Sequence, residues 1–170
     1  MFNLSKNISV SYVRNFVFGV EDSLVSTVGL LSGIAIAGAE AKGIFITGLV
    51  LIFVEAFSMA VGSFLSESSA EEFLKQGKAS ARKPFAGGVI MFFSYFISGF
   101  IPLFPYLAMP VSSAFPVSII LSLVALFILG LIGAKISNVG LFKNGFRMLI
   151  IGGIAIGAGV IVGKFAGTLY

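Results

Sequence analysis

The chain has 170 residues, of which 58% are hydrophobic and 11% are charged, and its mean hydropathy is +1.09. Soluble domains carry about 25% charged residues, so this composition excludes an ordinary soluble protein and indicates that much of the surface faces lipid. Cys and His are absent, which excludes disulfides, zinc sites of the Cys/His kind and His-based catalysis.

The sequence predicts an all-α membrane protein with five transmembrane helices in a single domain, residues 1–170. A helix needs about 20 apolar residues to cross a bilayer. Five segments are long enough, at residues 16–37, 44–65, 85–107, 115–134 and 146–168. The only extended hydrophilic stretch is the link at residues 66–84. Because proline removes a helix hydrogen bond, Pro102, Pro105 and Pro110 predict that the third helix kinks or ends there.

The distribution of Lys and Arg predicts the orientation in the membrane. The N-terminal tail, the 66–84 link and the link after the fourth helix would share one side, and they hold all but two of the eleven positive residues. The exceptions are Lys42 and Lys164. Because positive residues accumulate on the cytoplasmic side, we expect the N-terminus to be cytoplasmic and the C-terminus to lie outside.

The first two predicted helices carry carboxylates within their apolar segments. With a rise of about 1.5 Å per residue, Asp22 lies about 9 Å in from the cytoplasmic edge, level with Met59 on the second helix, and Glu55 lies about 15 Å in. A charge at the bilayer centre costs at least about 2.5 kcal/mol, and no Lys or Arg lies at mid-depth to offset it. We therefore interpret Asp22, Glu55 and Met59 as candidate metal ligands. The alternative is a structural ion pair or a protonated packing residue.

Small and polar residues follow one face of each of these two helices. On the first helix this face consists of Asp22, Ser26, Gly29 and Gly33. On the second helix it consists of Glu55, Met59, Gly62 and Ser66. We expect the two faces to match and to form a cation path. Small residues also let helices approach closely in lipid, so Gly29, Gly33 and Gly62 are predicted helix-packing positions, within one subunit or between two.

Each of the other acids has more than one possible role. Glu21 points about 100° away from Asp22 around the helix, so the two cannot face one groove squarely. Glu21 is a further candidate metal ligand, or it pairs with Arg14 or with a basic residue from another link. The 66–84 link contains Glu67, Glu71 and Glu72. These three acids either line a cytoplasmic entrance to the path or belong to a solvated helix.

The candidate ligands favour particular ions. Carboxylates alone would suit Mg²⁺, Ca²⁺ or protons, whereas the thioether of Met59 shifts the preference toward transition metals such as Fe²⁺. Because a ligand must be deprotonated to coordinate a metal, Asp22 could hold either a metal ion or a proton. Such a group can couple the movement of one to the movement of the other.

Two segments resemble the vacuolar iron transporter family, which includes yeast vacuolar iron/manganese carriers and plant nodulin-like relatives. The first is Arg14 followed by GVEDS at residues 19–23, where the family has Gly-x-x-Asp-Gly, and the second is SMAVGSFLS at residues 58–66. The resemblance implies export of Fe²⁺ or Mn²⁺ from the cytoplasm, coupled to inward proton movement. It also implies a homodimer with a path lined by the first two helices, and Asp22 and Met59 as pore ligands.

The sequence departs from this family in the 66–84 link. Several members carry a three-helix cytoplasmic domain at this place, with several Glu and Met ligands that gather metal. A link of this length cannot hold such a domain and retains only its three glutamates. We therefore expect the ion-gathering function to be reduced or absent, which leaves the choice of metal less determined.

The sequence thus predicts a proton-coupled exporter of Fe²⁺ and/or Mn²⁺. An enzyme is not expected, because no nucleophile–base pair or cofactor motif is visible. The alternatives are a passive divalent cation channel and a non-transporting membrane scaffold subunit with ion-paired acids. We expect lipid, divalent metal ions and a second copy of the chain as partners, and neither nucleic acid nor a resident cofactor. A short chain without a recognisable vacuolar sorting signal suggests a prokaryotic plasma membrane, or the vacuolar membrane if the source is eukaryotic.

Overall fold

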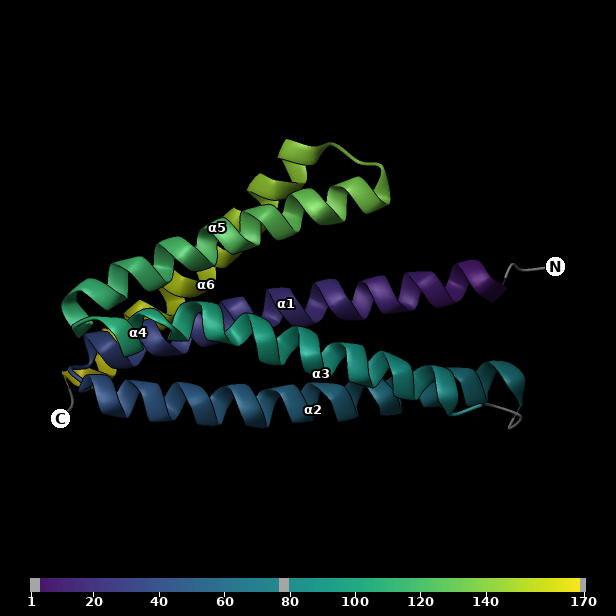
Figure 1. Ribbon diagram of the computed structural model, residues 1–170, viewed down its shortest axis with the longest axis horizontal. Coiled ribbons are helices and arrows are strands. Elements are labelled where there is room, and N and C mark those ends of the chain that lie inside the picture. Colours follow the sequence, from purple (N-terminus) through teal and green to yellow (C-terminus); the bar gives the residue numbers. More distant parts are fainter. Residues whose placement is uncertain (1–3, 77–79, 169–170) are drawn as a thin grey trace.

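The computed structural model describes residues 4–76 and 80–168, which fold into six helices (Figure 1). In chain order these are α1 (Leu4–Ile36), α2 (Ala41–Lys75), α3 (Arg82–Leu103), α4 (Pro105–Ala108), α5 (Val111–Ser137) and α6 (Leu141–Gly167). All but the short α4 are long and apolar enough to cross a membrane, α1 over Val10–Ile36. The predicted all-α class and the five predicted transmembrane helices are therefore confirmed.

The helix boundaries follow from particular residues. The α2 helix continues past the predicted end at residue 65 to Lys75, so about half of the predicted 66–84 link is helical. The α3 helix ends at Leu103, earlier than the predicted residue 107. Pro105 cannot continue the hydrogen-bond ladder and instead begins α4, and Pro110 precedes α5. The prediction that the prolines would kink or end the third helix is confirmed by the break before Pro105, whereas Pro102 lies inside α3.

Two turns at helix ends use left-handed backbone conformations. After α1, Gly38 has φ +90° and the Ala39 N–H donates to the Ile34 carbonyl at 3.1 Å. After α5, Asn138 has φ 53° and the Val139 N–H donates to the Ala134 carbonyl at 3.0 Å. Gly and Asn are the residues that adopt this conformation most readily, and the pattern satisfies the last carbonyls of each helix. These turns reverse the chain so that α2 and α6 run antiparallel to the helices before them.

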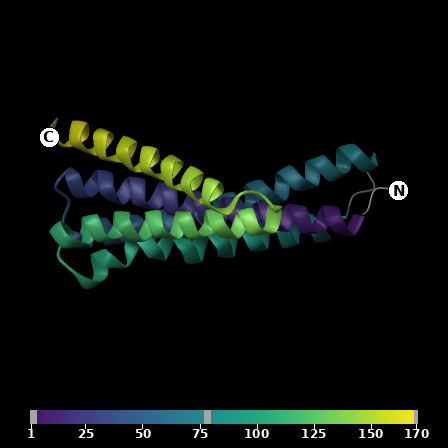
Figure 2. The same cartoon turned by 90° about the horizontal axis from the view of Figure 1, so that it is seen from above.

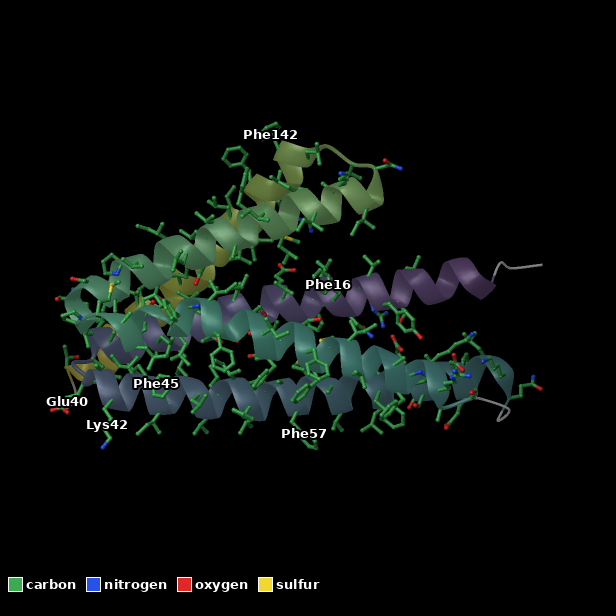
Figure 3. The ribbon with its side chains drawn as sticks, in the orientation of Figure 1. Phe16, Glu40, Lys42, Phe45, Phe57 and Phe142 are labelled. Atoms are coloured by element: carbon green, nitrogen blue, oxygen red, sulfur yellow. The ribbon has the colours of Figure 1, made fainter. Side chains whose placement is uncertain are left out.

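The first helix is the centre of the bundle, because it packs against α3 and α2 on one side and against α5 and α6 on the other. The α5–α6 hairpin is shorter than the other arm and ends well before the start of α1 and the end of α2 (Figures 1 and 2). We call the end where α1 begins the Arg14 end. The opposite end, where the side chains of Glu40 and Lys42 project from the start of α2, is the Lys42 end (Figure 3).

The buried hydrophobic core lies toward the Lys42 end, where five helices meet. Its fully or almost fully buried members are Leu31, Ile44, Ile52, Leu103, Tyr106 and Ala114. Large apolar side chains also cover the outside of the bundle, and Phe57, which is 66% exposed, points away from it (Figure 3). Such extensive apolar exposure is expected where lipid rather than water surrounds the helices.

The closest helix contact joins α1 to α6 through glycines. A Cβ atom built at Gly33 would lie 2.9 Å from the Gly159 carbonyl oxygen, and one built at Gly163 would lie 2.5 Å from the Gly33 Cα. Backbone therefore meets backbone, and Gly29 faces Gly159 in the same way. The prediction that Gly29 and Gly33 match the polar face of the second helix is wrong, because these positions are occupied by α6 within the same chain.

Candidate functional site

The two deep acids, Asp22 and Glu55, lie on the neighbouring helices α1 and α2. Asp22 and Glu55 are both half-buried, and they are near enough for their negative charges to repel each other. In the part of the chain that the structure describes, neither acid takes part in an ion pair within 4.0 Å. Two unneutralised carboxylates on neighbouring membrane helices are costly, and a cation between them would offset the repulsion.

A buried tyrosine completes this part of the site from α3. Tyr95 is fully buried, and its hydroxyl lies 2.7 Å from the Ser26 hydroxyl. The negative charges of Asp22 and Glu55 act on this tyrosine hydroxyl. Its backbone carbonyl accepts a hydrogen bond of 2.7 Å from Ser23, the residue that stands where the resembling family has Gly. These two hydrogen bonds fix the rotation of α1 against α3, and therefore the direction in which Asp22 points.

Sequence reasoning missed Tyr95 and the contribution of α3. The available signal was the polar spacing Ser94-Tyr95-x-x-Ser98 within an apolar helix, because polar side chains in a membrane helix usually face a partner helix. Ser98 turns back on its own helix and bonds the Ser94 carbonyl at 2.6 Å. The tyrosine hydroxyl is the one that reaches another helix.

Glu21 lies on a different side of α1 from Asp22. Its charge is attracted by Arg147 of α6, with no ion pair within 4.0 Å among the described residues. The sequence left two partners open for Glu21, Arg14 or a basic residue of another link; Arg14 is paired with Glu67 instead, and the role of Glu21 as a metal ligand stays a prediction. The inference that the two neighbouring acids face different grooves agrees with this arrangement.

A cavity of about 660 Å³ opens between α1 and α2 toward the Arg14 end. It is lined by Arg14, Asn15, Phe18, Ser58, Met59, Gly62, Ser63, Ser66 and Met91. Phe18 and Met59 each lie one helical turn before Asp22 and Glu55, counted from the Arg14 end, so the lining of the cavity ends about one turn short of the two acids. The Ser63 hydroxyl is buried and accepts no hydrogen bond from, and donates none to, any described residue.

The three acids beyond residue 65 all lie on the continued α2 helix, but in different surroundings. Glu67 is only 13% exposed and is bonded by three side chains of α1. Glu71 pairs with Lys75 at 2.7 Å, and Glu72 is exposed. Within the described residues, no three acids gather closely enough to hold a metal ion. A site made by this chain alone would thus consist of Asp22, Glu55 and the Met59 thioether, supplemented by hydroxyls.

The sequence pattern of the VIT family matches residues 13–83 and 75–164 of the chain, which covers all five long helices. The chain belongs to the VIT family. The matched region contains every candidate ligand of the α1–α2 site. The match to the VIT family therefore includes the two helices that build the site.

Two curated relatives of this VIT-family chain come from Oryza sativa subsp. japonica. The chain is 39% identical over 59 residues to vacuolar iron transporter homolog 5 and 38% identical over 60 residues to vacuolar iron transporter homolog 4. Each match covers 35% of this chain and 28% of the relative. The chain therefore aligns with less than a third of the length of these relatives.

Proposed function

We propose that this chain is a proton-coupled exporter of a divalent transition metal, Fe²⁺ and/or Mn²⁺, and that α1 and α2 line the path. The single observation that carries the proposal is the pair of Asp22 and Glu55, which approach each other from two membrane helices without a basic partner within ion-pair distance in the described residues. Membership of the VIT family and the similarity to vacuolar iron transporter homologs support metal as the cargo.

In this proposal the acids alternate between metal and protons. Metal reaches the cavity from the cytoplasm, passes Met59 and binds between Asp22 and Glu55, which release their protons because coordinating ligands must be deprotonated. Protons from the opposite side then protonate the carboxylates and displace the metal. The thioether of Met59 favours softer ions over Ca²⁺. The metal moves as cargo, and no resident cofactor is needed.

We further propose that the working form is a homodimer. The cavity opens sideways, and Ser58, Gly62 and Ser66 are exposed on the same face of α2. Nothing lies within 4 Å of a Cβ built at Gly62. Polar groups facing hydrocarbon are unfavourable, and small residues permit close helix contact, so a second copy against this face would enclose the path.

The test is metal flux in proteoliposomes with Fe²⁺, Mn²⁺, Zn²⁺ and Ca²⁺ in parallel, with and without a pH gradient. Asp22→Asn should abolish transport of every metal, because the amide cannot exchange a proton for a metal. Met59→Leu should narrow the difference between Fe²⁺ and Ca²⁺. Glu40→Gln, at the exposed Lys42 end, is the charge-matched control and should behave like the unmodified protein.

Three results would contradict the proposal in different ways. Wild-type transport rates of Fe²⁺ by Asp22→Asn would show that the acid is structural. Metal flux that does not respond to a pH gradient would indicate a passive channel. A protein that moves none of the four metals, and whose acid variants lose only stability, would be a scaffold subunit.

A further inference from the structure

The α1 residue Arg14 is held at the edge of the cavity by a glutamate of α2. Its guanidinium donates to Glu67 Oε1 at 3.1 Å, and the same oxygen accepts hydrogen bonds from Asn15, at 3.1 Å, and from Ser11. The side chain of Arg14 is 66% exposed, whereas that of Glu67 is 13% exposed. The carboxylate is thus fixed by several donors, while the guanidinium remains open to the surroundings.

The position of Glu67 is fixed from a third helix as well. A Cβ built at Gly87 of α3 would lie 2.6 Å from Glu67 Oε2 and 2.7 Å from Asn15 Nδ2, so a larger residue at this position would have to displace these two groups. The carboxylate therefore sits in a socket made by α1 and α3. A carboxylate that is held in this way is poorly placed to collect metal ions, and its fixed contact is with Arg14.

Among the described residues that line the cavity, Arg14 alone is charged. A cation that moves from the Arg14 end toward Met59 must pass this guanidinium. In a cavity with low-dielectric walls, a single positive charge repels cations strongly, and a fixed counter-charge beside it reduces the repulsion. The neighbouring pair of Glu71 and Lys75 has the same charges, but neither residue lines the cavity.

We propose that Arg14 sets the electrostatic barrier to cations at this end of the cavity, and that Glu67 sets the height of the barrier by neutralising Arg14. Glu67 is thus a positioning residue that acts through Arg14 and not a metal-gathering acid. The inference rests on the proposed function, since it concerns the cargo of that path. The electrostatic effect itself can be measured without any transport.

The direct test measures the potential inside the cavity with a reporter cysteine, since the chain has no other. Ser58→Cys places the reporter at an exposed position in the lining of the cavity. Purified protein is reacted with a cationic and an anionic methanethiosulfonate of similar size, and the ratio of the two rates is recorded. We expect Glu67→Gln to lower the cation-to-anion ratio about tenfold and Arg14→Gln to raise it about tenfold, with the double variant near the starting ratio.

Two features separate this electrostatic effect from a structural one. Gln at position 67 retains an acceptor for Ser11 and Asn15, so the fold should persist. Glu71→Gln and Lys75→Gln each remove one charge of the same sign as Glu67 and Arg14, respectively, away from the cavity, and should leave the ratio unchanged. The Debye length falls from about 10 Å at 0.1 M salt to about 3 Å at 1 M. The changes in the cation-to-anion rate ratio caused by Glu67→Gln and Arg14→Gln should therefore be smaller at high salt.

Flux measurements on the same variants extend the test to the cargo. Metal uptake at low metal concentration should be slower for Glu67→Gln and faster for Arg14→Gln. If the two single variants move the reagent ratio in the same direction, or leave it unmoved, the inference is overturned. If the ratios shift as expected but the unmodified protein transports no metal, the barrier stands and the proposed function fails.

Discussion

Replacing Gly163 by Ala should destabilise the bundle by opening the contact between α1 and α6. The new methyl carbon would lie 2.5 Å from Gly33 Cα, whereas non-bonded carbon atoms prefer about 3.5–4.0 Å. The obstructing atoms belong to backbone, so no side chain can rotate away, and the two helices must separate by about 1 Å. Overpacking of this kind typically costs about 1–3 kcal/mol of unfolding free energy.

The matched control is Gly157→Ala on the same helix, where nothing lies within 4 Å of the added methyl group. Ala is a better helix former than Gly by about 0.5–1 kcal/mol, so this variant should be slightly more stable than the unmodified protein. Because both substitutions share this gain, they should differ by the overpacking cost alone, about 1–3 kcal/mol. For a chain of this size that corresponds to roughly 2–12 °C in thermal midpoint.

The assay is thermal unfolding of both variants in one detergent, followed by loss of the monodisperse peak in size-exclusion chromatography. Equal midpoints for Gly163→Ala and Gly157→Ala would refute the reasoning, because the close α1–α6 approach would then not exist in the folded protein. A large loss at both positions would also refute it, since Gly157 has no neighbour to displace.

Three further outcomes are expected. Tyr95→Phe removes the hydroxyl bonded to α1 and should lower the unfolding free energy by about 1 kcal/mol. Thr27→Val removes a buried hydroxyl with no partner among the described residues and should be neutral or stabilising. Chemical unfolding compares the two variants, and equal effects would contradict the hydrogen bond between Tyr95 and Ser26. Cysteine at Gln76 should react with impermeant reagents only from the cytoplasmic side, and labelling of intact cells from outside would reverse the predicted topology. Gly62→Cys should form a disulfide-linked dimer in membranes while Ile154→Cys, exposed on α6, should not; the opposite pattern would move the subunit interface away from α2.

The helices could be read from the sequence because their signal is strong and local. Long apolar segments, and prolines that cannot donate a backbone hydrogen bond, placed five membrane helices and the break after Leu103. The end of α2 was harder, because a helix that leaves the membrane no longer needs apolar residues, and its polar continuation to Lys75 resembles a loop in composition.

The candidate site could be predicted only in part. Helix rise and periodicity brought Asp22 and Glu55 together, since both lie on adjacent antiparallel helices. Periodicity could not tell which neighbour each face of α1 would meet. Gly29 and Gly33 therefore were matched to α2 although they contact α6, and the contribution of Tyr95 depended on a helix pairing that no sequence pattern specified.

The surroundings of Glu67 could not be predicted either, because its partners lie far away in the sequence. Its sequence neighbours were compatible with an acid at the cytoplasmic entrance or in a solvated helix, but its hydrogen-bond partners lie more than fifty positions away on α1, at Ser11, Arg14 and Asn15. A contact of such long range depends on how far α2 extends and on the rotation of both helices. Local composition carries no information about either.

The pairing of α1 with α6 has a consequence for how the protein is made. The glycines that receive α6 emerge from the ribosome early, while their partners at Gly159 and Gly163 are synthesised near the end of the described chain. Until then, the backbone groove along Gly29 and Gly33 must remain next to lipid or next to the insertion machinery. Translation that stops before α6 would leave this groove open, so quality-control proteases in the membrane should remove such fragments quickly, and assembly of the bundle should be limited by release of its last helix.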